Sequence, residues 1–464
     1  MRMSRLMKII ACICSMSVSS FSQNWINAGL PVLPLELKTI HVDTASQRMF
    51  VGGLTPINTS GGMTVCMFDG NNWSVMDTFN NVIRSIITYH NELYVAGDFN
   101  TVNSQAMKAI TKWNGTNWVN ISGNITNSVV NMKVLNDTLY AVGSFTQIGG
   151  ITASGVAKWD GINWSDVHAF PTNSGGQTIS DIEIYNGDIY VGGNFSTTLG
   201  GITDIAMYKN GTWQRVGGSL DTLRGGFTGV ATLQVYNNEL YAGGLILQYQ
   251  GNVGHGIQKW NGTNWSEVGT GVQGAVNDNN NICQIHKLRV YENKLFASGN
   301  FQYAGNGLCP KIACWDGQQW CGFSREIGLN NTVTSFNFYK DTLYIGTIDS
   351  IEHIYVNQLA KFAKGTTVDT CSINFTGINL GNDTKNSITI YPNPSSDKIS
   401  IILSETGYEK YMLYLYSITG EKIYQSQFNS NEELEINISN FSPGMYFIKL
   451  INSDKTLVTK FIKE

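Results

Sequence analysis

Charged side chains are scarce in this chain. Lysine, arginine, aspartate and glutamate together make up 14% of the 464 residues, and the formal net charge at pH 7 is −4. A domain that binds nucleic acid carries a basic patch, because contacts to phosphate require lysine and arginine. This composition supplies no excess of basic residues, so we expect no nucleic acid among the partners.

Long hydrophobic runs are also lacking. After the first 22 residues, no stretch approaches the roughly 18 consecutive apolar residues that a membrane-spanning helix requires. The sequence therefore predicts no transmembrane segment. The hydrophobic content is still 42%, which is enough for a large core and for two domains.

The spacing typical of metal sites is missing as well. No two cysteines form a Cys-x-x-Cys pair, and the histidines stand singly, without the spacing of metal ligands. These histidines are His41, His90, His168, His255, His286 and His353. We expect neither a bound metal nor a cofactor.

The first 22 residues have the features of a signal peptide. Basic residues precede an apolar stretch from Ile9 to Val18, and small residues precede a predicted cleavage point after Ser22. A lipoprotein signal at Cys12 is the alternative, but little apolar segment precedes that cysteine. We therefore expect an exported chain that begins at Gln23.

Cysteines outside this signal number six. They are Cys66, Cys283, Cys309, Cys314, Cys321 and Cys371. An even number in an exported chain permits disulfides, and the pairing stays open because six cysteines can pair in many ways. Four of the six fall between residues 283 and 321, so we expect one or two local bridges there.

What the chain does contain is a repeat built on glycine and aromatic residues. A short aromatic segment, usually closed by glycine, occurs seven times, with its aromatics 44 to 55 residues apart. These aromatics are Phe50, Tyr94, Tyr140, Tyr190, Tyr241, Phe296 and Tyr344. Strand-like units at such a period indicate a radial array of sheets, and a β-propeller fits best.

Each repeat contains the strands of one propeller blade. In residues 230–268, the first two strands meet at Asn237-Asn238 and the last two meet at Asn261-Gly262. Such dipeptides suit tight turns, and Asn-Gly or Asp-Gly recurs at the last turn of six repeats. The sequence thus predicts blades of four strands.

Tryptophan marks the register of the repeats. All 11 tryptophans occupy repeat positions, before or after the last turn, where we expect them in the core between blades; stacking on sugars is the alternative. The seventh repeat lacks the second tryptophan, whereas Trp25 near the mature N-terminus stands in a matching context. We therefore predict that the first strand closes the last blade, so that residues 23–365 form seven blades without an exposed edge.

The order of a Gly-Gly strand, an aromatic strand and a tryptophan strand resembles the kelch-type propeller and the central propeller of galactose oxidase. The resemblance covers about residues 24–365 and concerns the fold more than the function. Galactose oxidase itself would imply copper and a crosslinked tyrosine–cysteine pair, for which this sequence offers no support.

The repeat stops near residue 365. Residues 366–386 are polar and contain glycine, as is typical of a linker. Residues 387–464 hold six or seven short alternating strands divided by turns, which predicts a small Ig-like β-sandwich.

This C-terminal segment resembles the type A sorting domain of the type IX secretion system of Bacteroidetes. The matching residues include Tyr391, Pro392, Asn393 and Pro394, the turn at Gly420, and Gly444 and Tyr446. The resemblance implies the type IX machinery as a partner, and passage from the periplasm across the outer membrane to release or anchoring at the cell surface. An Ig-like accessory domain without a sorting role is the alternative.

Propeller topology predicts which loops lie together. The tight turns share one face, whereas the longer loops and the connections between blades share the other. We expect this long-loop face to bind a glycan or a protein. The candidate contacts are Arg224, Tyr249, His255, Tyr303 and Arg325.

Two classes of function remain. The sequence favours a non-catalytic secreted or surface module for binding and adhesion over a glycan-active hydrolase or lyase. Glycoside hydrolysis needs two carboxylates beside the bond, and the available acids are Asp98, Asp204, Asp278 and Glu326. The Asp-Gly-x-x-Trp segments resemble the sialidase Asp box only loosely. Arginines around a tyrosine in the central channel would favour the enzyme, and small or apolar residues there would count against it.

Overall fold

The computed structural model describes residues 25–464 apart from several segments. Those segments are 32–35, 55–62, 169, 172–176, 197–201, 218–228, 247–254, 275–282, 306, 324–331, 347–349, 352–353, 357, 363–386, 405–409, 418–421, 431 and 453–455. Every regular element among the described residues is a β-strand, so the predicted all-β class is confirmed. The predicted signal peptide and linker lie outside the described residues.

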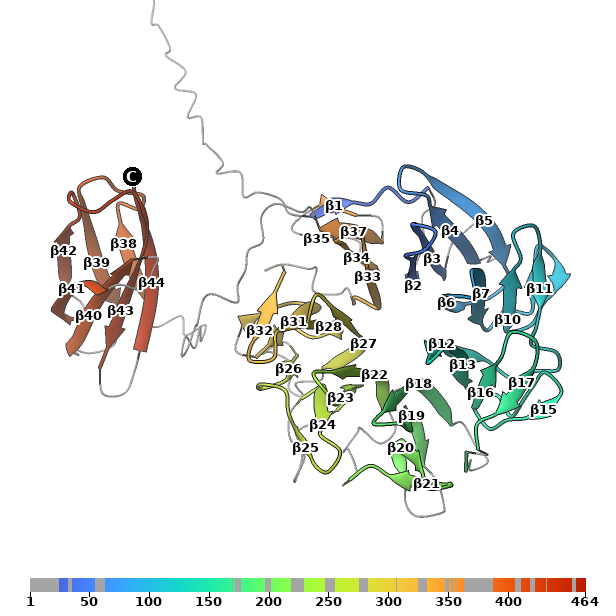
Figure 1. The fold of residues 1–464 in the computed structure, drawn as a ribbon. Helices are drawn as coiled ribbons and strands as arrows, with labels where there is room; N and C mark the ends of the chain where they lie inside the picture. The colour runs from blue at the N-terminus through green and yellow to red at the C-terminus, as the bar shows by residue number, and fades with distance from the viewer. Residues whose placement is uncertain are drawn as a thin grey trace, which may run out of the picture. The chain divides into compact units, whose positions relative to one another are not determined.

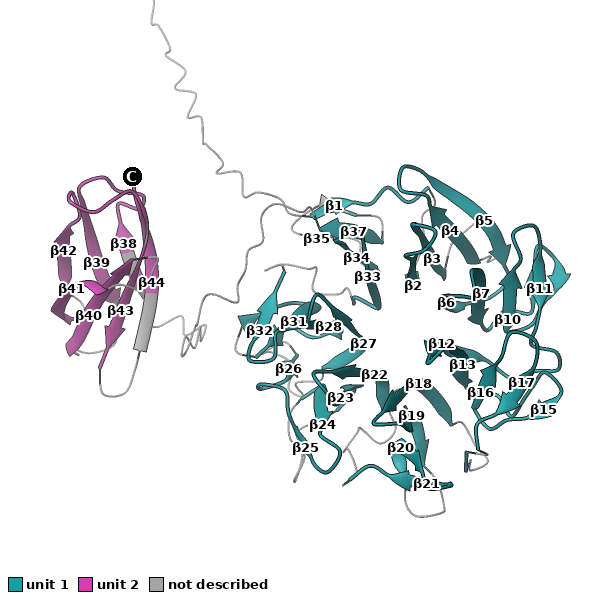
Figure 2. Ribbon diagram, in the orientation of Figure 1, with its two compact units in different colours: residues 1–373 teal, residues 374–464 magenta. Residues whose placement is uncertain are grey.

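The chain divides into two compact units, residues 1–373 and residues 374–464 (Figure 2). In the described residues of the first unit, seven sheets contain at least four strands each. Figure 1 shows these sheets arranged radially, as in a β-propeller, with one strand of each nearest the centre.

The first three blades share this order of strands from centre to rim. They contain β2 (Glu36–Asp43), β3 (Arg48–Leu54), β4 (Met63–Phe68) and β5 (Trp73–Phe79); β6 (Ile83–Tyr89), β7 (Glu92–Gly97), β10 (Ile110–Trp113) and β11 (Trp118–Asn120); and β12 (Val129–Leu135), β13 (Thr138–Gly143), β16 (Val156–Trp159) and β17 (Trp164–Asp166). The first sheet is extended by β8 (Thr101–Val102) and β9 (Gln105–Ala106).

The next three blades repeat the arrangement. They contain β18 (Thr178–Tyr185), β19 (Asp188–Ser196), β20 (Thr203–Lys209) and β21 (Thr212–Arg215); β22 (Val230–Tyr236), β23 (Glu239–Gly244), β24 (Ile257–Trp260) and β25 (Trp265–Glu267); and β27 (Gln284–Tyr291), β28 (Lys294–Asn300), β31 (Ile312–Trp315) and β32 (Trp320–Gly322). Short additional strands form small sheets: β14 (Gln147–Ile148), β15 (Ile151–Thr152), β26 (Val272–Gln273), β29 (Tyr303–Ala304), β30 (Gly307–Leu308), β35 (Ser350–Ile351) and β36 (Ile354–Tyr355).

The last blade combines the two ends of the propeller. Its strands are β33 (Ser335–Tyr339), β34 (Thr342–Gly346), β37 (Leu359–Phe362) and the N-terminal β1 (Trp25–Asn27). Trp25 lies opposite Phe362, is 1% exposed, and has its ring centroid 4.9 Å from that of Phe362. Trp25 therefore stands where the repeat pattern expected it.

The tryptophan after each outer turn joins its blade to the preceding one. In five of the six, the indole N–H donates a hydrogen bond to a carbonyl near the end of the neighbouring outer strand, as Trp73 does to Ala28 over 2.9 Å and Trp164 to Ile121 over 2.7 Å; Trp118 donates instead to the Asp77 carboxylate over 2.6 Å. Trp213, Trp265 and Trp320 make equivalent bonds. These tryptophans therefore lie between blades, as predicted.

The recurrent aspartate or asparagine is explained by the turn it occupies. Asp160 Oδ1 accepts hydrogen bonds from the N–H groups of Ile162 and Asn163, over 2.8 and 2.7 Å, and Gly161 has a φ of 103°. Four other outer turns have the same pair of bonds. Turn chemistry therefore accounts for these residues without a catalytic role.

Gly299, near the end of β28, permits a bulge in the neighbouring innermost strand β27. A Cβ on Gly299 would lie 2.0 Å from the carbonyl oxygen of Gln284. Ile285 pairs with Gly299 and Lys287 pairs with Ser298, so His286 is an extra residue in β27. The same irregularity occurs near the start of β2, β6, β12, β18 and β22. The glycine repeat thus adds one residue at the same height in six blades.

One or two local disulfides were predicted among the four cysteines between residues 283 and 321, and Cys283 and Cys309 take part in none. Both are free thiols, as is Cys66, while Cys321 is disulfide-bonded. Cys283 and Cys309 belong to one apolar cluster, where burial raises the pKa of their thiols to about 12 and about 11. They pack as small hydrophobic residues. Cys371 lies outside the described residues.

The second unit consists of two facing sheets with one core. The first sheet contains β38 (Ser387–Tyr391), β39 (Lys398–Ser404) and β42 (Glu433–Asn437), and the second contains β41 (Lys422–Asn429), β40 (Lys410–Ser417), β43 (Gly444–Ile451) and β44 (Thr456–Lys463). Ile401 of one sheet and Leu413 and Ile448 of the other are fully buried in the same cluster. Alternating side chains therefore build a β-sandwich.

Candidate functional site

A pocket of about 460 Å³ opens where the innermost strands begin. Four of its lining residues are the bulged residues Lys38, Arg84, Val130 and His286, and Thr334 directly precedes β33. The remaining lining residues are Glu36, Gln284, Asn300 and Thr332. These residues come from five consecutive blades, so the pocket lies around the axis of the ring. We call it the channel mouth.

The channel mouth lies on the face that the sequence singled out. Each innermost strand follows a connection between blades, and those connections share a face with the longer loops. The bulged residues therefore stand at the long-loop end of the channel. A rigid ring holds them, which suits a recognition site.

Two ion pairs flank the channel mouth. Glu36 pairs with Lys38 on β2, and Arg84 Nε and Nη2 donate to the two carboxylate oxygens of Asp98 over 2.8 and 2.6 Å. Burial raises the pKa of Asp98, but hydrogen bonds from Arg84 and Ser128 and the charge of Arg84 hold it below its ordinary value. Asp98 is therefore an ionised partner of arginine, which is unsuited to donating a proton.

His286 offers a neutral polar group to the channel mouth. Burial, reinforced by the charge of Lys38, lowers the pKa of His286 to about 4. At pH 7 its imidazole is uncharged, with one donor and one acceptor nitrogen. Among the described residues it makes no hydrogen bond, so both nitrogens are available to a ligand.

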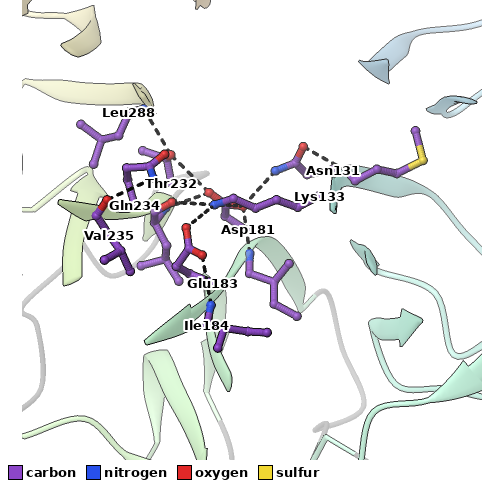
Figure 3. Close-up of polar contacts among 12 residues, drawn as sticks. Asn131, Lys133, Asp181, Glu183, Ile184, Thr232, Gln234, Val235 and Leu288 are labelled. Carbon is purple, nitrogen blue, oxygen red and sulfur yellow. Dashed lines mark hydrogen bonds and ion pairs between the residues drawn. The ribbon is translucent and has the colours of Figure 1, made fainter. Parts of the chain in front are cut away.

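Below the channel mouth, Lys133 on β12 connects three blades (Figure 3). Its ammonium group lies 2.9 Å from Glu183 Oε2 and 3.6 Å from Asp181 Oδ1 on β18, and it donates to the carbonyl oxygen of Leu233 on β22 over 2.8 Å. Burial alone would lower the pKa of Lys133, but Asp181 and Glu183 raise it above its ordinary value. Lys133 is thus a fixed cation with its own counter-ions.

Asp181 is the centre of this network. Its carboxylate accepts hydrogen bonds from Asn131 Nδ2, the Thr232 hydroxyl and the Leu233 N–H, over 3.0, 3.3 and 2.8 Å (Figure 3). It is 2% exposed. Because its oxygens are occupied by β12 and β22, Asp181 joins neighbouring blades and is not placed for proton transfer to a ligand.

Two of the five predicted contact residues are described, and neither lines the channel mouth. The carbonyl oxygen of His255 accepts a hydrogen bond from Val272 over 2.9 Å, and Tyr303 pairs with Gln273 between β26 and β29. His255 and Tyr303 therefore lie near one another through β26. Arg224, Tyr249 and Arg325 lie outside the described residues. The binding role of these five residues stays a prediction.

The residues that line the channel mouth were not among the sequence candidates. Lys38, Arg84 and His286 stand in short strands, two residues before a buried aliphatic residue, at the same place in their repeats. In a chain with only 14% charged residues, cations in the innermost strands were the available signal. The candidate contacts predicted from the sequence came instead from the long polar loops.

The carboxylates considered for catalysis do not gather in the described part of the pocket. Asp98 is paired with Arg84, and Asp204 is a buried residue with a φ of 60° at the start of β20. Asp278 and Glu326 lie outside the described residues. The two channel linings considered from the sequence are arginines around a tyrosine, and small or apolar residues. The described residues that line the channel mouth match neither, because they include charged side chains but no tyrosine.

The sorting motif holds the last strand of the sandwich. Asn393 Oδ1 accepts a hydrogen bond from the Ile462 N–H over 2.9 Å, and the Ser395 N–H donates to the Ile462 carbonyl over 3.0 Å. Tyr391 ends β38 and stands beside Pro392 and Pro394. Asn393 and Ser395 therefore hold β44 beside the end of β38.

The other motif residues lie around β43. Gly444 begins this strand, and the Tyr446 hydroxyl donates to the carbonyl of Ser442 over 2.6 Å while its ring stacks on Phe461 with centroids 5.4 Å apart. Gly420 lies outside the described residues. The part of each residue in sorting stays a prediction.

Fold and site together define a β-propeller with a polar channel mouth and a separate C-terminal β-sandwich. Residues 389–464 match the family described as the secretion system C-terminal sorting domain. The predicted sorting domain is confirmed, and it indicates secretion or surface display through the type IX system. Among the described residues, no helix is long and apolar enough to cross a membrane.

Comparison with solved structures matched the GH32 beta-fructofuranosidase BmSUC1 of Bombyx mori at 9% identity and a TM-score of 0.27, over 95% of this chain and 88% of that one. An aspartate-to-alanine mutant of that enzyme in complex with sucrose matched at 9% identity and a TM-score of 0.24, over 92% and 86%. Similarity this low supports no transfer of activity. Comparison with curated proteins gave no match.

Proposed function

We propose that this protein is a secreted or cell-surface binding module that recognises a glycan or a protein at the channel mouth. The predicted signal peptide delivers it to the periplasm, and the sorting domain directs it across the outer membrane. We also propose that the blades are kelch-like, because the order of a Gly-Gly strand, an aromatic strand and a tryptophan strand in each repeat resembles that of kelch-type propellers. The propeller is then the portion that meets the ligand.

The channel mouth carries this proposal. Its lining residues come from the same height of five neighbouring blades and present charged and polar groups, while each blade is joined to the next by hydrogen bonds. A rigid concave site with a few polar groups fits ligand recognition, because little conformational entropy is lost on binding. Neutral His286 adds a donor and an acceptor for hydroxyl or amide groups.

The alternative, a glycan-active hydrolase or lyase, has weaker support. Glu36 is the one carboxylic acid among the described residues that line the channel mouth, and it is paired with Lys38. A glycosidase of the common type needs a second carboxyl group roughly 5 to 10 Å from the first. Binding without turnover therefore fits the described site better.

A glycan array and a hydrolysis assay on the same sugars test this function with the full-length secreted protein. We expect binding without hydrolysis, and a loss of affinity of about tenfold or more in His286→Ala, which removes a polar contact. His90→Ala is the matched control, because His90 stands at an exposed hairpin turn on the opposite face.

Each outcome of this assay has a distinct meaning. Hydrolysis of an array sugar supports the enzyme instead. If no array glycan binds but a protein ligand is captured and its binding depends on His286, the channel mouth is supported as the binding site and the ligand is a protein. Equal binding by wild type and His286→Ala contradicts recognition at the channel mouth.

A further inference from the structure

The channel below the mouth holds more positive than negative side chains. Lys133 of β12 and Lys287 and Arg289 of β27 are the cations, and Asp181 and Glu183 of β18 are the carboxylates. His41 of β2 also lies here, and burial, aided by the nearby charge of Arg289, lowers its pKa to about 4, so it is neutral. The whole chain carries a net charge of −4, so a positive excess in its centre is notable.

The two carboxylates already have a cation of their own. Lys133 lies 2.9 Å from Glu183 and 3.6 Å from Asp181, and Asp181 also accepts three hydrogen bonds from β12 and β22. The negative charges of Asp181 and Glu183 are therefore partly balanced by Lys133 within the network of Figure 3. The positive excess falls on Lys287 and Arg289.

Neither Lys287 nor Arg289 has an ion pair or a hydrogen bond among the described residues. Arg289 Nε is buried without an acceptor there. Burial lowers the pKa of Lys287 to about 8, against the opposing charge of Asp181, and lowers that of Arg289 to about 10. For Lys133, in contrast, Asp181 and Glu183 outweigh burial and raise the pKa. A half-buried cation without a partner is unfavourable, because its lost hydration is not fully replaced. Two such cations side by side therefore call for an anion.

Their place on the strand connects them to the channel mouth. Lys287 and Arg289 are two residues apart on β27, so they face the same side, whereas Ile285 and Leu288 are buried in the apolar core. The bulge puts His286, which lines the channel mouth, directly before Lys287. A ligand that enters past His286 therefore meets Lys287 first and Arg289 roughly two residues, or 7 Å, further along.

Lys287 departs from the residues at its position in other blades. Ser85, Asp181 and Thr232 each accept a hydrogen bond from a backbone N–H of the next blade. Lysine has no acceptor and cannot make this bond. Its presence at this height is thus unexplained by the packing of blades.

We propose that Lys287 and Arg289 form an oxyanion subsite inside the propeller channel, which holds a carboxylate or sulfate group of the ligand that enters through the channel mouth. The subsite rests on the proposed binding function and narrows its ligand to an anionic one. Arg289 offers a planar set of donors that suits two oxygens of one group, and Lys287 adds a point charge.

Titration of the full-length protein with inorganic sulfate, glucuronate and neutral glucose at constant ionic strength tests the subsite. We expect sulfate or glucuronate at millimolar concentration to raise Tm in a saturable way, and glucose to have no effect. Lys287→Met should weaken the anion affinity by about tenfold to hundredfold, because it removes a charge-assisted hydrogen bond. Lys259→Met is the matched control; Lys259 pairs with Glu239 in another blade.

A second readout separates this role from simple loss of structure. Without anion, Lys287→Met should have a Tm equal to or above that of wild type, because an unpaired, half-buried charge is removed. Lys287→Arg should keep the anion response. If Lys287→Met does not fold, Arg289→Leu replaces it in the same titration.

The outcomes distinguish the subsite from the binding function. A response to glucuronate alone assigns a sugar acid, and a response to sulfate alone assigns a sulfate group. Equal anion affinity in wild type and Lys287→Met, or no response in wild type, overturns the subsite. A neutral ligand that requires His286 but not Lys287 overturns the subsite and leaves the proposed function in place.

Discussion

Burial decides what the titratable side chains of the channel can do. Desolvation of the half-buried His41 on β2, reinforced by the charge of Arg289, lowers its pKa to about 4, and its Nε2 lies 2.8 Å from the Thr88 hydroxyl. Lys133 keeps its charge because two carboxylates surround it. The neighbours of each basic side chain therefore decide its state: His41 is neutral, Lys133 is a paired cation, and Lys287 is a cation without an ion pair among the described residues.

Protonation of His41 should make stability depend on pH. The unfolded chain binds a proton at His41 near pH 6.5, whereas the folded protein binds it near pH 4. Between these values the unfolded state holds more protons, so the free energy of unfolding falls as pH falls through this window. His41→Gln should reduce the slope by up to about 1.4 kcal/mol per pH unit.

Urea unfolding across this pH window, for wild type and His41→Gln, measures the difference. His90→Gln, which replaces a histidine on an exposed turn, is the control. The same slope in all three proteins contradicts the burial of a neutral imidazole at His41.

At the scale of strands, the bulge links the glycine repeat to the site. Gly299 leaves room for the carbonyl of Gln284, and the resulting irregularity adds His286 to β27. Equivalent bulges add Lys38 and Arg84 to their strands. The channel mouth is therefore built from a backbone bulge that glycine permits. The side chain at the bulge differs between blades, as Lys38, Arg84 and His286 show.

Gly299→Ala should remove the bulge or strain it. A Cβ would lie 2.0 Å from a backbone oxygen, which cannot move like a flexible side chain. We expect a loss of about 1 to 3 kcal/mol of stability in urea unfolding, and weaker binding of any ligand that contacts His286. Gly307→Ala is the control, because the nearest atom to its Cβ would be 3.5 Å away. Unchanged stability and binding in Gly299→Ala would contradict the packing described.

At the scale of the whole propeller, the ring depends on two distant strands. β1 adds Trp25 to the blade of β37, and Ala28 accepts the indole N–H of Trp73 in the next blade. Each blade otherwise packs against its neighbours through shared apolar clusters and through hydrogen bonds. The ends of the propeller therefore close a structure that would have two exposed edges.

Trp25→Ala should open this closure. The side chain is 1% exposed, so we expect a loss of about 3 to 5 kcal/mol in the free energy of unfolding. Ile26→Ala on the same strand is the control; Ile26 is 45% exposed and should lose less than about 1 kcal/mol. Similar losses for both variants, measured by urea unfolding, would show that β1 does not seal the ring.

Local patterns in the sequence determined much of this architecture. Asn-Gly and Asp-Gly dipeptides predicted the outer turns, the aromatic period predicted the radial sheets, and the unmatched Trp25 predicted the position of β1. The C-terminal motif identified the sorting domain, which the family match confirms. These features could be predicted because each depends on a turn, a strand or a period that is visible within one repeat.

Only the tertiary structure decided where the channel mouth lies and which charges are satisfied. Lys38 and His286 are separated by almost the whole propeller in sequence, yet they line one pocket because the ring returns β27 close to β2. Lys133 finds Glu183 and Asp181 across blades, whereas Lys287 does not find a partner among the described residues. The pairing of these charges depends on distances between blades, and a single repeat carries no information about those distances.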